Sequence, residues 1–457
     1  MSTVRIGNAA GFWGDNLDAP RALVERGELD YLTLEYLAEL TLSILAHQRS
    51  KNADAGFVPD FLTVLGGLLP LLSSQPRLKI VTNGGGMNPV ACARHAARAC
   101  AVAGLGELRV AAVWGDDLFP RIDELSAAGE PFTNFDSGKP FDEVRPRLAS
   151  ANAYLGAAGI VSALEQGARI VVTGRVADAS LTVGPAVFEH RWPWDDWQRL
   201  GAATVAGHLI ECGAQTTGGM FSGWDGSFSL ENLGYPIAEV SDDGAVVLTK
   251  PANTGGAVTV DTVAEQLVYE IADPAHYLTP DVDADFSRVE LAQVGEDRVA
   301  VRNANGRPAP PRFKVSMAYR DGFMASGTLV VCGHGAAKKA RETGKLILSR
   351  LKAAGAAPER SHIEVLGTGD TLPGVWVWPY NDGPLEVVLR VSVHDPSREK
   401  LERFVREFSP LAGSGPPGIT GYTGPRSKPY PVFAYWPTTV SRERISPIVE
   451  VRQAAEW

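Results

Sequence analysis

The sequence contains few cysteines, and none of them are spaced for a metal site. Its four cysteines, Cys92, Cys100, Cys212 and Cys332, form no CxxC pair. Cys92 and Cys100 fall in one expected helix, about 12 Å apart along its axis, which is too far for a disulfide. This pattern predicts a reduced protein without a disulfide framework or a cysteine zinc site.

Long apolar runs and an excess of basic residues are also missing. The longest apolar run, residues 61–72, is about half the length that a bilayer requires and contains Gly66, Gly67 and Pro70. Residues 1–15 have no basic region followed by an apolar stretch, so no secretory signal is expected. Lys and Arg total 43 against 53 Asp and Glu, a net charge of −10, which argues against nucleic-acid binding. We therefore expect a cytoplasmic homo-oligomer that binds neither membrane nor nucleic acid.

The first half alternates short apolar runs with amphipathic ones, which indicates βαβ units and a mostly parallel sheet flanked by helices. Expected strands cover residues 4–7, 31–34, 79–82, 108–113 and 169–173, and expected helices cover 19–26, 38–48, 90–103 and 151–166. The fold class is thus α/β in this half.

The second half changes to alternating Val, Ile and Leu segments separated by Gly and Pro turns, which is typical of a β-rich α+β domain. Strands are expected at 245–249, 299–302, 313–318 and 328–332, and helices at 337–353 and 397–408. Residues 385–393, the second of these helices and residues 448–451 suggest a small α+β layer. We expect an α/β domain over residues 1–228, with a crevice at its strand ends, and an α+β domain over residues 229–457.

Five expected strands each end in a short loop with glycine and polar residues. Parallel strands place such loops at one edge of the sheet, where ligands bind in open α/β folds. The polar candidates in these loops are Asp15, Glu35, Asn83, Asn88, Asp116, Asp117, Arg175, Asp178 and Ser180. We expect Asp15, Glu35, Gly85, Arg175 and Asp178 to line one crevice.

Residues 83–89 (NGGGMNP) form the most glycine-rich of these loops. Backbone N–H groups there, with the following helix, could bind an anion or carboxylate, although a tight strand–helix turn also requires glycine. The substrate-binding candidates in this loop are Asn83, Gly84, Gly85, Gly86 and Asn88. No Lys-Ser/Thr pair follows, so the loop is not a P-loop, and no GxGxxG pattern is present, so a nicotinamide cofactor is not supported.

Residues 174–180 place Arg175 and Asp178 just beyond a strand. An arginine can bind a carboxylate with two parallel hydrogen bonds, and an aspartate can act as a general base. The alternative is structural, because Asp178 could cap the next helix or simply pair with Arg175.

His208 and Glu211 are three residues apart and share one helix face. That spacing suits a metal or a base with an orienting partner, but an ordinary His–Glu contact explains it equally, and no second histidine lies nearby. Gln215 and Thr216 follow in a polar loop that could donate hydrogen bonds to a substrate carbonyl. No cofactor is identified, and a divalent metal has no specific support.

Several segments together resemble the acyclic terpene utilisation (AtuA-like) family over roughly residues 3–350. They are residues 11–15 (GFWGD), 37–41 (LAELT), 83–89, 174–181 (GRVADASL), 211–215 (ECGAQ) with 217–219 (TGG), 255–266 (GGAVTVDTVAEQ), 269–274 (YEIADP), Tyr277 and 279–282 (TPDV). Many longer relatives carry an additional small ferredoxin-like domain with an NARSGD motif, and this sequence does not contain that motif.

The resemblance implies a role in the catabolism of branched, citronellol-type terpenoids, whose intermediates are acyl-CoA thioesters. It implies a small branched acid or its CoA ester as ligand and carries over no catalytic residues. The resemblance is also compatible with a small ferredoxin-like partner protein.

Three hypotheses follow. The first is an enzyme that hydrates, dehydrates, isomerises or cleaves a branched acyl thioester or carboxylate. Asp178 or Glu35 would transfer the proton, and Arg175 with the 83–88 loop would hold the substrate oxygen. The second is a non-catalytic ligand-binding or scaffold subunit of a partner enzyme. The third is phosphoryl chemistry with Asp15, Asp116 and Asp117 as magnesium ligands.

Overall fold

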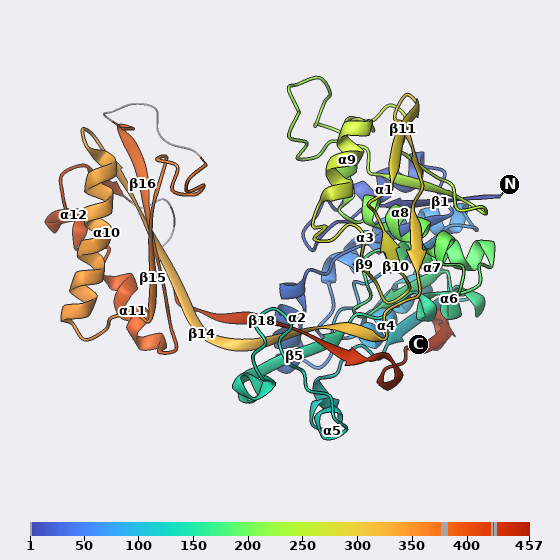
Figure 1. The fold of residues 1–457 in the computed structure, drawn as a ribbon, viewed down its shortest axis with the longest axis horizontal. Coiled ribbons are helices and arrows are strands. Elements are labelled where there is room, and N and C mark those ends of the chain that lie inside the picture. The colour runs from blue at the N-terminus through green and yellow to red at the C-terminus, as the bar shows by residue number, and fades with distance from the viewer. Residues whose placement is uncertain (1, 376–382, 422–423, 425–426) are drawn as a thin grey trace. The chain divides into compact units, whose positions relative to one another are not determined.

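The computed structural model of the chain describes residues 2–375, 383–421, 424 and 427–457 (Figure 1). The chain forms two compact units. The first contains the chain up to Ala318 together with Tyr435–Trp457, and the second is Tyr319–Ala434. The boundary expected after residue 228 falls inside the first unit, so the compact units divide the chain at other places than the sequence pattern indicated.

The first unit is built on a ten-stranded mixed sheet with the order β11-β12-β8-β7-β1-β2-β3-β6-β4-β19. Its centre consists of five parallel strands, namely β1 (Thr3–Asn8), β2 (Tyr31–Leu34), β3 (Lys79–Thr82), β6 (Ile170–Thr173) and β4 (Arg109–Trp114). All residues of β2 and β6 are buried, as expected for parallel strands covered on both faces. The predicted α/β class with a mostly parallel N-terminal sheet is confirmed.

Antiparallel strands extend this sheet at both edges. β7 (Ile237–Ser241), β8 (Val246–Thr249), β12 (Arg298–Arg302) and β11 (Glu290–Gly295) follow β1 on one side, and β19 (Ile448–Gln453) pairs with β4 on the other. Of the expected small α+β layer, residues 385–393 and the helix over 397–408 lie together in the second unit, but residues 448–451 do not. Residues 448–451 instead complete the first sheet by pairing with β4.

Helices cover both faces of the sheet. The helices of this unit are α1 (Ala19–Arg26), α2 (Glu39–Lys51), α3 (Pro59–Ser74), α4 (Pro89–Val102), α5 (Ile122–Ala127), α6 (Ala158–Glu165), α7 (Ser180–His190), α8 (Trp197–Glu211) and α9 (Val260–Val268). α1, α3 and α4 pack on one another and share a core with Leu32, Ile80 and Val172. α6, α7 and α8 form a second packed group. Successive residues of a strand face opposite sides, so each group receives one set of strand side chains.

The expected helix over residues 151–166 is only half present. Its first part is a strand, β5 (Leu148–Ala153), which pairs with β14, and α6 begins at Ala158. An Ala-rich segment has no clear period, so its pairing with a strand some 160 residues away decides the structure.

The remaining elements of the first unit are short. They are β9 (Tyr277–Leu278), β10 (Asp283–Asp285) and β13 (Asn305–Arg307), which form a small sheet, and the 3₁₀ turns η1 (Phe119–Arg121), η2 (Phe141–Glu143), η3 (Arg145–Arg147), η4 (Gly213–Thr217), η5 (Arg442–Arg444) and η6 (Ala454–Glu456).

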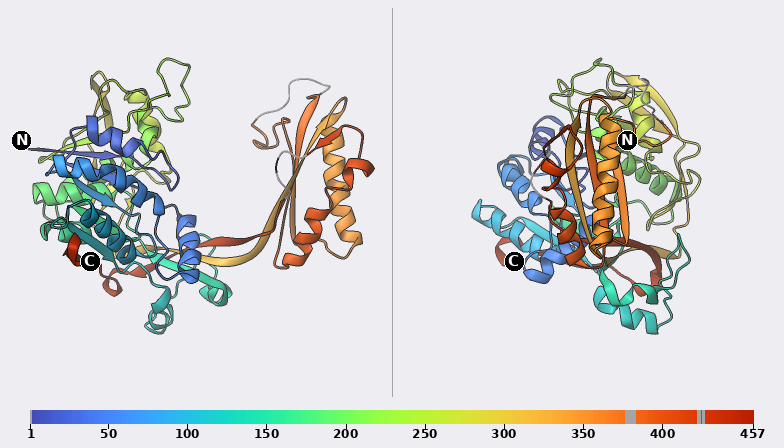
Figure 2. Two further views of the ribbon diagram at one scale, coloured as in Figure 1. Left: turned by 180° about the vertical axis from the view of Figure 1, so that it is seen from behind. Right: turned by 90° about the vertical axis from the view of Figure 1, so that its left-hand side faces the viewer.

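The second unit has a ferredoxin-like order of elements. It contains most of β14 (Arg312–Cys332), then α10 (Ala336–Ala353), β15 (Arg360–Leu366), β16 (Glu386–Asp395), α11 (Arg398–Arg406), α12 (Leu411–Ser414), β17 (Ile419–Gly421) and the start of β18 (Tyr430–Ser441). The sheet order β15-β16-β14-β17 is antiparallel throughout. α10 and α11 lie on one face of this sheet in both views of Figure 2, where Leu389, Ile347 and Phe404 form a core of its own.

Candidate active site

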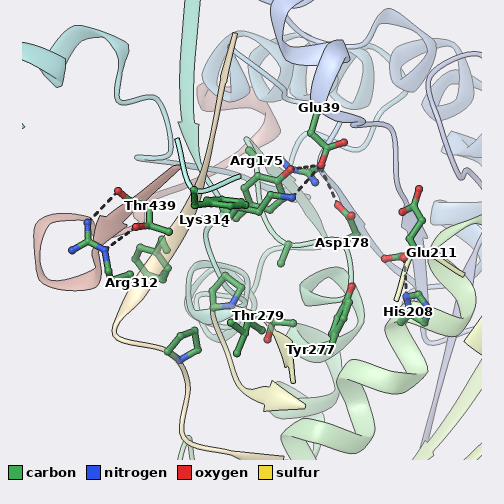
Figure 3. Close-up of a pocket in the computed structure, with 18 of the residues that line it drawn as sticks. Glu39, Arg175, Asp178, His208, Glu211, Tyr277, Thr279, Arg312, Lys314 and Thr439 are labelled. Atoms are coloured by element: carbon green, nitrogen blue, oxygen red, sulfur yellow. Dashed lines mark hydrogen bonds and ion pairs between the residues drawn. The ribbon is translucent and has the colours of Figure 1, made fainter. Parts of the chain in front are cut away.

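A cavity of about 510 Å³ lies in the first unit beside the loop that follows β6 (Figure 3). Its wall includes the start of α2, the end of β5, the end of α8, residues 277–280, residues 310–314 and Thr439. Acidic, basic and aromatic side chains all face this space. The expectation that second-half residues would contribute to the wall agrees with this arrangement, although they belong to the same compact unit.

The loop after β6 is held in place by a buried carboxylate. Oδ2 of Asp116 accepts hydrogen bonds from the backbone N–H of Arg175 (2.9 Å) and from Nδ2 of Asn152 (2.8 Å). Gly174 has no room for a side chain, since a Cβ there would lie 2.2 Å from Oδ1 of Asp116. Burial raises the pKa of Asp116 to about 6. Asp116 therefore positions the loop rather than facing the cavity.

Arg175 is one of the largest fully buried side chains and is only 2% exposed. Its Nη1 donates to the carbonyl oxygen of Leu37 (2.6 Å) and lies 2.9 Å from Oδ1 of Asp178. Its guanidinium carbon lies 4.1 Å from the ring centroid of Tyr154, a cation–π contact. Within the described part of the chain, its Nε has no hydrogen-bond partner. The guanidinium is therefore a fixed positive charge in the cavity wall.

Asp178 is the partner of Arg175 that reaches the cavity. Its side chain is 32% exposed, whereas that of Arg175 is 2% exposed. Desolvation raises the pKa of Asp178, and the positive charge of Arg175 opposes part of that rise. A carboxylate with a raised pKa is a better proton acceptor than an ordinary surface aspartate.

Glu35 lies behind this pair, and the cavity wall does not include it. Its Oε1 is 3.8 Å from Nη1 of Arg175 and accepts a hydrogen bond from the N–H of Leu37 (2.8 Å), and its Oε2 contacts Nδ2 of Asn83. Burial raises the pKa of Glu35 well above the usual range, and the charge of Asp178 adds to that rise. Glu35 is therefore placed to influence the pKa values of Arg175 and Asp178 rather than to contact a ligand.

A second charged group borders the same space. Tyr154 donates from its hydroxyl to Oε1 of Glu39 (2.9 Å), and Nζ of Lys314 lies 3.2 Å from the same oxygen. Desolvation would raise the pKa of Glu39, but Lys314 and Arg175 outweigh it and hold the pKa at about 2. Glu39 therefore stays ionised and pairs with Lys314 at the cavity wall.

His208 and Glu211 also line the cavity, at the C-terminal end of α8 (Figure 3). Nδ1 of His208 lies 3.1 Å from Oε1 of Glu211, and both side chains are buried. Nε2 of His208 is 2.9 Å from the carbonyl oxygen of Gln266. The predicted i, i+3 contact is thus formed, and it faces the cavity.

The glycine-rich loop forms a closed turn away from the cavity. The N–H groups of Gly84, Gly86 and Asn88 bond to oxygens within the loop or its strand. A Cβ on Gly85 would lie 2.5 Å from the carbonyl oxygen of Thr173, so strand β6 packs directly on it. The side chain of Asn88 caps α4. These contacts correspond to the structural alternative for this loop.

The other substrate-binding candidates also lie outside the cavity wall. Asp15 accepts hydrogen bonds from the N–H of Gly11 (2.8 Å) and the hydroxyl of Tyr235 (2.7 Å), which brace its loop. Gln215 and Thr216 lie in η4. Of the five residues expected in one crevice, Arg175 and Asp178 line the cavity, and Glu35 contacts Arg175 from behind.

The aspartates considered as magnesium ligands have other partners. Asp117 pairs with Arg49 at 2.7 Å, and Asp116 binds the β6 loop. Across the residues that the structure describes, no group of three or more His, Cys, Asp or Glu side chains is arranged to hold a metal ion.

Several wall residues were not predicted from the sequence. Glu39 and Tyr277 fall in segments that carried the family resemblance, which was their only signal. Tyr154, Lys314 and Thr439 reach the cavity through chain pairings between distant segments, and nothing in their local sequence marks them.

The fold and the cavity define an α/β protein with a cavity lined by acidic, basic and aromatic side chains beside the loop that follows β6. The family model for the acyclic terpene utilisation family protein AtuA matches residues 4–451. The chain therefore belongs to this family, which associates it with the utilisation of acyclic terpenes. No curated protein matches the chain. Among the described residues, no helix is both long enough and apolar enough to cross a bilayer.

Proposed function

We propose that this protein is an enzyme that uses acid–base chemistry on a branched acyl thioester or carboxylate during acyclic terpene utilisation. The reaction classes open to it are hydration, dehydration, isomerisation and carbon–carbon cleavage. Each moves a proton and develops negative charge on the carbonyl oxygen of the acyl group, so each is helped by a base and a positive charge close together.

The observation that carries this proposal is the Arg175–Asp178 pair. Nη1 and Oδ1 are 2.9 Å apart, with the arginine buried and the aspartate open to the cavity. A carboxylate that faces a cavity beside a charged partner, with its pKa raised by desolvation, is typical of functional sites. In our proposal Asp178 takes the proton, and Arg175 holds Asp178 and stabilises negative charge that forms on the substrate oxygen.

The composition of the wall supports a branched acyl ligand. Phe135, Leu278, Pro280 and Phe313 supply apolar surface, and Lys314 supplies a positive charge. A branched hydrocarbon chain fits apolar walls, and a carboxylate or thioester oxygen fits the cationic side. The cavity, at about 510 Å³, has room for an acyl group of this kind.

The test is turnover of a panel of branched acyl-CoA thioesters and free acids by the isolated chain. Asp178→Asn should keep ligand binding and lower kcat by about 10²- to 10⁴-fold, because the amide keeps the shape but cannot accept the proton. Arg175→Lys should not restore what Arg175→Ala loses, because an ammonium cannot replace a planar guanidinium. Asp142→Asn, whose side chain is 87% exposed, is the matched control.

A purely structural Arg175–Asp178 pair gives a different pattern. In that case Arg175→Ala and Asp178→Asn both lower the melting temperature without a specific effect on kcat. If the parent chain binds thioesters and converts none of them, the alternative of a non-catalytic ligand-binding or scaffold subunit replaces the enzyme proposal.

A further inference from the structure

The pair of His208 and Glu211 has a defined hydrogen-bond direction. Nε2 of His208 faces a backbone carbonyl oxygen, that of Gln266, at 2.9 Å. A carbonyl oxygen only accepts, so Nε2 carries a proton in every state of the ring. The exchangeable proton of the pair then lies between Nδ1 of His208 and Oε1 of Glu211, which are 3.1 Å apart.

The second oxygen of Glu211 lacks a partner. Glu211 is only 8% exposed, and within the described part of the chain its Oε2 is buried without a hydrogen bond. Buried polar atoms nearly always have a partner, because leaving one unpaired costs about 1–3 kcal/mol. The side chain lines the cavity, so a polar atom of a bound ligand is the natural partner for Oε2.

The charges around the pair favour its protonated form. Burial raises the pKa of Glu211, with the hydrogen bond from His208 opposing, and the charges of Asp178 and Glu270 add to the rise. Glu211 in turn raises the pKa of His208 against the effect of burial. Tyr277 packs against the ring of His208, with centroids 5.6 Å apart. The pair therefore keeps its shared proton to a higher pH than either residue would alone.

We propose that Glu211 is a second proton-transfer residue of this cavity, that its Oε2 meets a hydroxyl oxygen of the substrate, and that His208 is its positioning residue. This inference rests on the proposed function and narrows it to the addition or elimination of water. Asp178 and Glu211 project into the same space from the β6 loop and the end of α8 (Figure 3).

The two carboxyl groups would have different roles in the reaction, Asp178 as the base and Glu211 as the acid. In elimination, Asp178 removes the proton from C2 of a branched 3-hydroxyacyl thioester, and the C–H electron pair forms the C2–C3 double bond. The C3–O bond breaks with its electron pair on oxygen, Glu211 donates a proton from Oε2 to that oxygen, and water leaves. The proton shared between Oε1 and Nδ1 of His208 stays with the pair. Asp178 then loses its proton to solvent and Glu211 regains one. Addition of water is the reverse.

The first test is turnover of 3-hydroxy-3-methylbutanoyl-CoA and 3-methylbut-2-enoyl-CoA. Glu211→Gln should lower kcat by about 10²- to 10⁴-fold without lowering the melting temperature, because the amide keeps a hydrogen bond to His208 but carries no acidic proton. Glu211→Asp should restore part of the activity. Glu25→Gln, on an exposed helix surface, is the matched control and should match the parent.

The role of His208 is tested by its pH profile. His208→Asn places an amide nitrogen near the position of Nδ1 and removes the shared proton. In elimination, where Glu211 is the acid, it should therefore shift the alkaline limb of kcat rather than only scale it. An active parent enzyme whose Glu211→Gln variant is equally active would overturn the inference while leaving the proposed function intact.

A second test needs no substrate. In ¹⁵N NMR of protein labelled at histidine, the His208 signal is the one that His208→Asn removes. Glu211→Gln should lower the pH at which this signal titrates. An unchanged His208 titration refutes the pair as a proton-sharing unit, even if no thioester in the panel is converted.

Discussion

Arg175 stays charged at the candidate site because of the groups in contact with it, not because it is solvated. Arg175 is 2% exposed, yet its guanidinium touches Asp178, the carbonyl of Leu37 and the ring of Tyr154. Removing one partner of such a group leaves a buried charge uncompensated, which typically costs about 3–5 kcal/mol. The consequences of substitution here therefore depend on which contact is lost.

Asp116 gives the residue-scale prediction for pH. Its pKa is about 6 in the folded protein against an ordinary 3.8, so the folded state binds this proton more tightly. Its contribution to stability is favourable below about pH 4, falls as the pH rises to about 6, and is absent above. The free energy of unfolding of Asp116→Asn, relative to that of the parent, should therefore rise by up to about 3 kcal/mol between pH 4 and pH 7.

Urea denaturation at a series of pH values measures this difference. The asparagine oxygen can still accept from Arg175 N–H and Asn152, so the loop should remain in place. If the free energies of unfolding of parent and variant differ by the same amount at every pH, the raised pKa of Asp116 is contradicted.

At the scale of elements, the loop after β6 depends on a close approach that only glycine permits. Gly174→Ala places a methyl group 2.2 Å from Oδ1 of Asp116, and such overpacking costs about 1–3 kcal/mol. The melting temperature should fall, and ligand binding should weaken with it because Arg175 and Asp178 move.

The same substitution in α3 should have the opposite sign. Gly67 is exposed in the middle of that helix, and a Cβ there meets nothing within 4 Å. Gly67→Ala should stabilise the protein by about 0.5–1 kcal/mol through helix propensity, with no effect on ligand binding. Equal effects of the two variants on melting temperature would contradict the local argument at Gly174.

At the scale of the molecule, two separate cores predict two unfolding steps. Leu32 is buried in the core of the first unit and Leu389 in the core of the second. Leu32→Ala and Leu389→Ala should each cost about 2–5 kcal/mol, but each should shift a different transition in scanning calorimetry. A single transition that both variants shift equally would show that the units unfold together.

Much of the first unit could be predicted from the sequence because its signals are local. Short buried strands followed by amphipathic helices fix β1, β2, β3 and β6, and β2 and β3 have the expected bounds, Tyr31–Leu34 and Lys79–Thr82. Parallel strands then place the loops after them at one edge. The position of Arg175 and Asp178 beyond β6 was predictable in this way, and so was their contact three residues apart.

What only the tertiary structure decided involves segments far apart in the chain. The pairing of β19 with β4, the entry of β8 and β12 into the first sheet and the ferredoxin-like order of residues 319–434 have no local signature. The cavity shares this property, since Tyr154, Tyr277 and Lys314 meet Asp178 only after the chain has folded. Local periodicity determines which residues are buried, whereas long-range strand pairing determines which buried residues become neighbours.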